Sequence, residues 1–253
     1  MTEKKFLSFL LKQYDKPFEG WDFSYLNDTA RIAQAPLRWC YANKVTEKIK
    51  DSEIMLDMCT GGGEFLSLLQ PLPPITCATE AYKPNIPVAK ANLSKIGVKV
   101  FSLADEMKTP FEDDFFDLVI NRHGSFCCDE LYRIMKQNSC FITQQVGIKN
   151  NEKLNIDLGS NAMVIEEENW CMDTVVKQFL NMGFDVLESY EEFPLTRFYD
   201  VGAIVYYLKA IPWQIPDFSV EKYLPGLLKI DNIIKEKGFY DINYHRFFIS
   251  VKK

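Results

Sequence analysis

Short apolar runs alternate with more polar stretches between residues 54 and about 145 of this chain. The alternation predicts βαβ units, in which a parallel sheet is covered by helices on both of its faces. We therefore expect an α/β fold with short crossover helices between its strands. The five predicted strands are IMLDM at 54–58, PITCATE at 74–80, VKVFSLA at 98–104, FDLVIN at 116–121 and CFITQQV at 140–146.

Helix signals fill the stretches between and after these runs. Gly97 and Gly183 stand where a helix would end. Lys136 closes a segment with an acidic start, as the helix dipole favours. The predicted helices cover 64–70, 85–97, 129–137 and 166–182, and they are followed by a strand at 184–192 and a closing strand or hairpin at 239–253.

Composition and charge limit the classes of partner. Hydrophobic residues make up 47% of the 253 residues and charged residues 25%, which is ordinary for a globular protein and excludes a disordered chain. The net charge is −6, and no segment concentrates basic residues. A nucleic-acid partner is therefore not favoured, although a local basic patch would permit one.

The cysteines and the N-terminal segment bear on location. Seven cysteines occur without a C-x-x-C pair, which indicates reduced thiols in a cytosol. Neither histidine stands at ligand spacing from a cysteine pair, so no metal site is predicted. Charges at Lys12, Asp15 and Lys16 interrupt a short apolar patch, and no signal peptide or membrane span is predicted. We expect a cytoplasmic protein with no membrane partner.

The most informative stretch is MLDMCTGGGEF at 55–65, where a buried strand ending in Asp57 meets a glycine-rich turn and an apolar helix. A strand, a tight glycine turn and a helix form a cradle for a ligand. Gly61, Gly62 and Gly63 permit positive φ and a close approach of the backbone. Glu80 stands 23 positions after Asp57, where an acid can accept both hydroxyls of a ribose. The alternative is an ordinary turn with Glu80 as a solvated charge.

The loop lacks the patterns of two common nucleotide sites. A G-x-G-x-x-G fingerprint would need its last glycine where Glu64 or Leu66 stands, and no G-K-[ST] follows for a phosphate-binding loop. A carboxylate at the helix start would also repel a pyrophosphate. A ligand with a ribose and a carboxylate but no phosphate is S-adenosylmethionine. From residue 54 to about 147, the chain resembles the class I S-adenosylmethionine-dependent methyltransferases.

The resemblance implies a Rossmann-like α/β methyltransferase fold. Its sheet is seven-stranded and mostly parallel, in the order 3-2-1-4-5-7-6, with the last strand antiparallel and helices on both faces. Asn138 and Ser139 replace the family's usual glycine pair before the fifth strand, and asparagine can adopt the left-handed turn conformation that such a glycine supplies.

The resemblance also implies the cofactor, S-adenosyl-L-methionine, and the residues that bind it. Asp57 matches the acid that holds the methionine ammonium, Glu80 the acid that binds the ribose hydroxyls, and Asp105 the acid that accepts the adenine amino group. Cys59 replaces the family's first loop glycine. The matching positions are Asp57, Cys59, Gly61, Gly63, Glu80, Ala81, Asp105, Glu106, Met107 and Asn121.

Methyl transfer asks mainly for a nucleophile held in line with the activated methyl group. The candidate catalytic residues are Asn121, Arg122 and His123, because the carboxyl ends of parallel strands face the ligand crevice. His123 is a candidate general base, or a side chain that packs at the strand end. Arg122 is a candidate ligand for an acidic substrate, or one half of a surface ion pair. Gln144 and Gln145 either orient an acceptor or cap the strand edge.

Two further patterns narrow the acceptor. Asn121 is not followed by the N-P-P-[YFW] pattern of amino-group methyltransferases, which weakens DNA adenine as a substrate. Cys127 and Cys128 lack the Pro-Cys context of the cytosine C5 enzymes, in which a thiolate attacks the ring. We expect them to be small buried hydrophobes.

Residues 1–50 and 194–237 do not follow the strand-and-helix rhythm, and neither has a linker-like border. We expect one domain over 1–253, with 1–50 as an N-terminal helical lid or substrate segment, 51–150 as the cofactor-binding core, and 194–237 as an insertion that covers the active site. Their aromatic residues form a lid or ordinary core. These residues are Trp21, Phe23, Tyr25, Trp39, Tyr41, Phe198, Tyr199, Tyr206, Tyr207 and Trp213.

The sequence thus predicts a methyltransferase whose acceptor is a small molecule. Three alternatives stay open. The acceptor is a base of ribosomal or transfer RNA, the protein binds the cofactor without turnover, or the protein is a nicotinamide-dependent oxidoreductase. Glu64 and Leu66 oppose the last of these.

Overall fold

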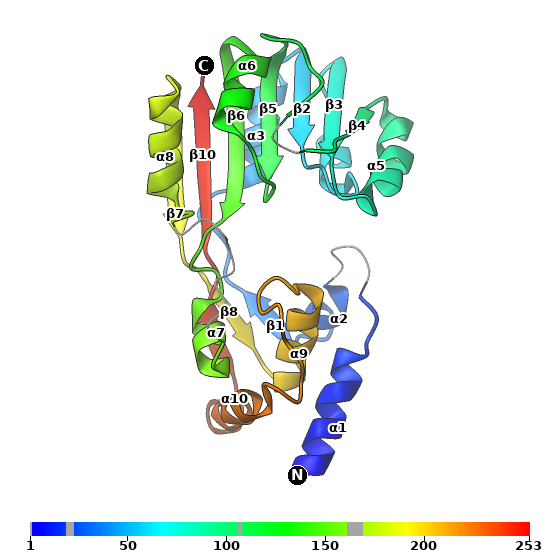
Figure 1. Ribbon diagram of the computed structural model, residues 1–253, viewed down its shortest axis with the longest axis vertical. Helices are drawn as coiled ribbons and strands as arrows, with labels where there is room; N and C mark the ends of the chain where they lie inside the picture. Colours follow the sequence, from blue (N-terminus) through cyan, green and yellow to red (C-terminus); the bar gives the residue numbers. More distant parts are fainter. Residues whose placement is uncertain (1, 19–22, 106–107, 161–168) are drawn as a thin grey trace. The chain divides into compact units, whose positions relative to one another are not determined.

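The computed structural model describes residues 2–18, 23–105, 108–160 and 169–253. The chain divides into two compact units, each built from three separate segments (Figure 1). The larger unit comprises Arg38–Gly147, Asn169–Glu191 and Arg246–Lys253. The smaller unit comprises Met1–Leu37, Ile148–Glu168 and Glu192–His245.

A seven-stranded sheet forms the centre of the larger unit, in the order β4-β3-β2-β5-β6-β10-β7 (Figure 1). The central strands β4, β3, β2, β5 and β6 are parallel, and β10 runs antiparallel to β6. Numbered within this sheet, the order is 3-2-1-4-5-7-6, so the predicted fold is confirmed. The strands are β2 (Ile54–Met58), β3 (Ile75–Glu80), β4 (Lys99–Ser102), β5 (Phe116–Arg122), β6 (Met135–Val146), β7 (Asp185–Glu192) and β10 (Arg246–Lys252).

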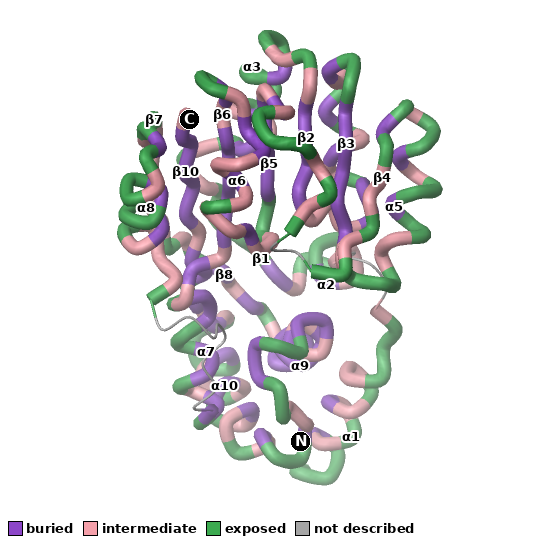
Figure 2. The backbone as a smooth tube through the Cα atoms, turned by 45° about the horizontal axis from the view of Figure 1, so that its top comes forward, coloured by how far each residue is buried: buried purple, intermediate pink, exposed green. Residues whose placement is uncertain are grey.

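Helices cover both faces of this sheet because its inner strands are apolar on both sides. Alternation along β2 sends Leu56 to one face and Met55 to the other. Leu56 lies in the cluster that includes Val175 of α8, and Met55 in the cluster that includes Val45 of α3. Figure 2 shows the resulting burial along β2, β5 and β6. The helices of this unit are α3 (Tyr41–Ile49), α4 (Glu64–Ser67), α5 (Asn85–Leu93), η1 (Ser94–Ile96), α6 (Cys128–Ile134) and α8 (Met172–Asn181).

Residues with a left-handed backbone conformation lie at the helix ends and the turn that the sequence predicts. Gly97 closes η1 with a φ of +78°, and Gly183 follows α8 with a φ of +88°. Asn138, in place of the family's glycine, has a φ of +67°. The prediction that asparagine supplies a left-handed turn here is confirmed.

The predicted helix at 129–137 extends too far. The helix α6 ends at Ile134, and Met135 is extended, with a φ of −86° and a ψ of 137°. Met135 pairs with Phe116 in the parallel ladder, so β6 begins there rather than at 140. Pairing with β5 thus places residues 135–137 in a strand, although their local pattern favours a helix.

The smaller unit has its own antiparallel sheet, in the order β1-β8-β9. The closing segment is therefore not one hairpin, since β9 pairs with β8 while β10 pairs with β6. The helix α9 is almost wholly buried (Figure 2). The elements of this unit are α1 (Glu3–Tyr14), α2 (Ser24–Asn27), β1 (Ile32–Gln34), α7 (Glu152–Leu158), β8 (Leu195–Phe198), α9 (Val201–Ala210), α10 (Leu224–Lys237) and β9 (Tyr240–Asn243).

An ion pair holds two segments of the smaller unit together. Arg31 donates to both carboxylate oxygens of Asp200, at 2.6 and 2.7 Å, and the same carboxylate caps α9 by accepting from the N–H of Ala203 at 2.9 Å. Hydrogen bonding to Asp200 raises the pKa of Arg31. This pair joins 1–50 to 194–237, the two segments set apart by their composition. Their role as a cover for the active site stays a prediction.

Among the residues that the structure describes, none of the helices combines the length and the hydropathy needed to span a bilayer.

Candidate functional site

The glycine-rich turn after β2 contacts the end of β3. The N–H of Thr60 donates to the carbonyl oxygen of Thr79 at 2.9 Å. The N–H of Gly61 donates to Oε2 of Glu80 at 2.7 Å. Two residues that are far apart in sequence are thus joined at the carboxyl edge of the sheet, as the spacing of the motif requires.

The glycines of this turn have different reasons to be glycine. Gly61 and Gly63 have φ values of +66° and +82°, in the left-handed region that favours glycine. A Cβ at Gly63 would lie 2.6 Å from Cγ of Leu93, so α4 packs against α5 only because that atom is missing. A Cβ at Gly61 would meet nothing within 4 Å. The face of the turn at Gly61 is therefore open to a ligand.

Glu80 is oriented by the backbone on both of its oxygens. Its Oε2 accepts from Gly61, and its Oε1 accepts from the N–H of Tyr82 at 2.7 Å. The side chain is only 5% exposed. A carboxylate has about four lone-pair positions, so two remain after these bonds. An oriented carboxylate with two remaining positions can accept the two hydroxyls of a ribose.

Asp57 is a buried carboxyl group that a cation would stabilise. Oγ1 of Thr60 donates to its Oδ2 at 2.6 Å. Burial raises the pKa of Asp57 to about 7, against the Thr60 hydrogen bond, which lowers it; the charge of Glu80 raises it further and that of Arg122 lowers it. An ammonium group beside Asp57 would favour its ionised form. This environment fits the methionine end of the implied cofactor.

The loop after β5 packs directly on the glycine-rich turn. Cys59 has a φ of +58°, and its Sγ lies 3.6 Å from the carbonyl oxygen of Ser125. A Cβ at Gly124 would lie 2.4 Å from Cβ of Cys59. Cys59, which stands where the resemblance implies a glycine, thus adopts a left-handed conformation, and Gly124 leaves the space for its side chain.

Asn121 joins the ends of three strands. Its Oδ1 accepts from Nε2 of Gln145 at 2.6 Å and from Oγ1 of Thr143 at 3.2 Å, and its Nδ2 donates to the carbonyl oxygen of Met58 at 3.3 Å. The side chain is fully buried. These bonds tie β5 to β6 and β2. Direct contact of Asn121 with cofactor or acceptor stays a prediction.

His123 stands in a hydrogen-bonded chain that begins at Trp39. Nε1 of Trp39 donates to Oε1 of Gln144 at 2.9 Å, and Nε2 of Gln144 lies 3.1 Å from Nε2 of His123. Desolvation and the positive charges of Arg246 and Arg122 hold the pKa of His123 well below its usual value. Part of the residue is nevertheless exposed. His123 is therefore neutral near pH 7.

Arg122 provides a positive charge at the same edge. It is exposed, and its guanidinium carbon lies 4.7 Å from the centre of the Phe65 ring on α4. Among the described residues, no acidic side chain forms an ion pair with Arg122. Its charge is therefore available to a ligand.

For the residues predicted at the adenine end, the structure gives only their exposure or does not describe them. Ala81 is half-buried and lies just after β3. Asp105 is exposed after β4. Glu106, Met107 and Trp21 lie outside the described residues. The adenine end of the implied site stays a prediction.

Two contributors were not foreseen. Thr60 supplies the hydroxyl on Asp57, and Oγ1 of Thr79 accepts from the N–H of Cys59 at 3.3 Å. The contact of Thr60 with Asp57 has a local signal in the sequence, a threonine three residues after an aspartate in a turn. The second depends on the pairing of β2 with β3.

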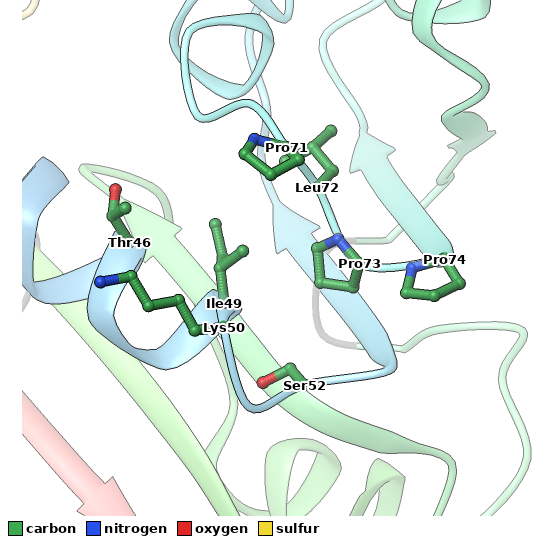
Figure 3. Close-up of a pocket in the computed structure, with 8 residues that line it drawn as sticks. All are labelled: Thr46, Ile49, Lys50, Ser52, Pro71, Leu72, Pro73 and Pro74. Atoms are coloured by element: carbon green, nitrogen blue, oxygen red, sulfur yellow. The ribbon is translucent and has the colours of Figure 1, made fainter.

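A separate hollow of about 330 Å³ lies at the opposite edge of the sheet (Figure 3). It is formed at the end of α3 by Ile49, Lys50 and Ser52, and by Pro71–Pro74 before β3, as Figure 3 shows. None of the predicted site residues lines it. The chemistry-bearing residues gather instead at the carboxyl ends of β2, β3 and β5.

Comparison with known proteins agrees with this geometry. Residues 56–142 match the family model described as Methyltransferase domain. No curated protein matches the chain.

Several solved structures are similar. A protein from Bacillus halodurans that is assigned to the methyltransferases is 17% identical, with a TM-score of 0.62, over 84% of this chain and 98% of that one. A protein of unknown function from Deinococcus radiodurans is 10% identical, with a TM-score of 0.60, over 98% of each chain. The [4+2]-cyclase SpnF is 12% identical, with a TM-score of 0.53, over 84% of this chain and 79% of that one. At these identities the likeness establishes the fold.

Proposed function

We propose that this protein, whose residues 56–142 match the methyltransferase domain model, is a class I S-adenosylmethionine-dependent methyltransferase that transfers the methyl group of S-adenosyl-L-methionine to a small molecule. The observation that carries the proposal is the Glu80 carboxylate, which two backbone N–H groups aim at the open face of the glycine turn. Asp57 lies on the same turn with a cation-favouring environment. Together they suit a ligand with a ribose and an ammonium group.

The bound cofactor would supply an activated methyl group on a sulfonium. The protein then has to bind it, orient it and admit a nucleophile in line. We assign the ammonium to Asp57, the methionine part to Cys59, Gly61 and Gly63, and the ribose to Glu80. Ala81, Asp105, Glu106 and Met107 are proposed for the adenine end. On the acceptor side we assign Asn121, Arg122 and His123, at the carboxyl end of β5.

The choice of a small-molecule acceptor is supported by charge. The net charge is −6 and basic residues are dispersed, which does not suit a phosphate backbone. We place acceptor specificity in the segments 1–50 and 194–237, and we place the protein in the cytoplasm, on the support of its seven cysteines, which form no disulfide.

Two alternatives carry specific support. An RNA base remains an acceptor to test, since stacking aromatics serve a flipped base as well as a planar small molecule. Binding of the cofactor without methyl transfer is the second alternative, because SpnF shares this fold and is a [4+2]-cyclase, so the fold alone does not imply methyl transfer.

Transfer of a tritiated methyl group tests the proposal. The protein is incubated with methyl-labelled S-adenosylmethionine and, separately, with the small-molecule fraction and the total RNA of a cell extract. We expect label in the small-molecule fraction and none in RNA. Label confined to RNA would show that the acceptor is RNA and not a small molecule. If neither fraction is labelled although the cofactor binds, the protein is a cofactor-binding protein and not a methyltransferase.

A further inference from the structure

The hydrogen-bonded chain from Trp39 fixes which nitrogen of His123 carries a proton. The indole N–H of Trp39 can only donate, so the Gln144 atom that it meets at 2.9 Å is the carbonyl oxygen. The amide NH₂ of Gln144 therefore faces His123. Because that NH₂ can only donate, Nε2 of His123 accepts at 3.1 Å and bears no proton. The proton of the neutral ring must be on Nδ1.

Packing and hydrogen bonds hold all three residues of this hydrogen-bonded chain in place. Gln144 is 5% exposed, and its backbone carbonyl oxygen accepts from the N–H of His123 at 2.8 Å. The Trp39 ring stacks on Tyr190 at 6.0 Å and packs against Phe248 at 6.3 Å. His123 itself has a φ of +63°. The tautomer is thus set by packing that does not depend on a ligand.

At the end of β5, the atoms that His123 and Arg122 leave for a ligand are donors. Nδ1 of His123 has no hydrogen-bond partner among the described residues, and the residue is exposed. Arg122 is the preceding residue, has no acidic partner in the described part of the chain, and has no accepting atom. The nitrogen of His123 that would take a proton from an acceptor already accepts from Gln144. Such a group of donors suits an anion and does not suit a nucleophile that must first lose a proton.

We propose that His123 is a neutral hydrogen-bond donor through Nδ1 to an acceptor oxygen that is already ionised, with Trp39 and Gln144 as its positioning residues. This inference rests on the proposed function and names its acceptor class, an oxyanion such as a carboxylate or a phenolate. The oxyanion attacks the methyl carbon, the O–C bond forms, and the C–S bond breaks with its electron pair returning to sulfur. The anion and the sulfonium become a neutral methyl ester or ether and a neutral thioether, so no base is needed.

The tautomer can be observed directly, because the chain has two histidines. In a long-range proton–nitrogen spectrum of protein labelled at histidine nitrogens, we expect His123 at pH 7 to be protonated at Nδ1 alone. His245 is the internal reference with the opposite form, since its Nδ1 accepts from the N–H of Lys149 at 3.2 Å. A His123 ring that is protonated at Nε2, or doubly protonated, in the unmodified protein would overturn the inference.

Matched variants test the positioning residues. In Gln144→Glu the atom facing His123 can only accept, so we expect Nε2 to become protonated and the pKa of His123 to rise. In Trp39→Phe the ring is kept but the donor is lost, and we expect a mixture of tautomers. Tyr190→Phe is the control, since it changes the other side of the same stack, and the His123 signals should stay unchanged. An unchanged spectrum in Gln144→Glu would refute the role of the chain.

The acceptor class is tested with three small probes in the presence of saturating S-adenosylhomocysteine. Benzoate represents a carboxylate, 4-nitrophenolate a phenolate, and aniline a neutral amine. We expect the Nδ1 signal of His123 to shift with one or both anions and not with aniline, and the response to be lost in Arg122→Met. An equal response to aniline, or no response to either anion, would overturn the oxyanion assignment. Failure of S-adenosylhomocysteine itself to bind would instead count against the proposed function, which the ligand-free spectrum does not test.

Discussion

The substitution Glu80→Gln separates the proposed ribose contact from a merely structural role. Each oxygen of Glu80 accepts one backbone N–H at 2.7 Å. A glutamine has one oxygen and one NH₂, so one of these backbone donors would face another donor. A hydrogen bond to a charged group contributes about 1.5–3 kcal/mol, and we expect the free energy of unfolding to fall by about that amount.

The same substitution should also weaken the binding of S-adenosylhomocysteine. One ribose hydroxyl loses a charged acceptor, so the Kd for S-adenosylhomocysteine should rise roughly ten- to hundredfold. Calorimetric titration at pH 8 measures this with Asp57 ionised. Urea denaturation without ligand measures the cost in stability separately.

Glu64→Gln is the matched control. It makes the same chemical change on the same turn, at an exposed residue in the first turn of α4. Its effect on the Kd should stay below about fivefold, because a charge at a helix N-terminus contributes about 0.3–1 kcal/mol. A folded Glu80→Gln variant that binds S-adenosylhomocysteine within twofold of the unmodified protein would refute the proposed ribose contact.

Three further outcomes follow from the structure. The pKa of Asp57 is raised to about 7 by burial, and an ammonium ligand needs the ionised form, so affinity for S-adenosylhomocysteine is full above pH 7 and falls about tenfold per unit below it; titration calorimetry should show this slope, and Asp57→Asn should abolish it. Gly124→Ala places a Cβ 2.4 Å from Cβ of Cys59 and 2.9 Å from Nδ2 of Asn121 and should cost about 1–3 kcal/mol in urea denaturation, with part of the loss recovered in the double variant with Cys59→Gly. Asp200→Ala removes a helix cap and the paired bonds to Arg31, and should lower the free energy of unfolding by about 2–3 kcal/mol; a change below 0.5 kcal/mol would contradict this.

Much of the larger unit follows from local pattern. The run at 54–58 is a strand with the same bounds in the structure, because apolar residues on both faces can be satisfied only inside a covered sheet. Asp57, the glycines and Glu80 meet as predicted because the carboxyl ends of adjacent parallel strands share one edge. The cofactor is therefore the part of the function that the sequence carries most clearly.

Other features depend on contacts between distant residues. The chain from Trp39 to His123 exists because Arg122 pairs with Gln144 in the ladder of β5 and β6, a register that no local pattern specifies. The switch from helix to strand at Met135 depends likewise on pairing with Phe116. The smaller unit is assembled from three segments of the chain, and the composition of each segment alone does not reveal their association.

We expect the glycine turn and Glu80 to bind S-adenosylmethionine rather than a dinucleotide. Thermal denaturation of the unmodified protein with S-adenosylhomocysteine or NAD, each in excess, tests it most directly. A ligand at about 100 times its Kd stabilises the folded state by roughly 2.7 kcal/mol, a shift of a few degrees at this size. We predict this shift with S-adenosylhomocysteine and none with NAD. A shift with NAD alone, or with neither ligand, would contradict the account of the site.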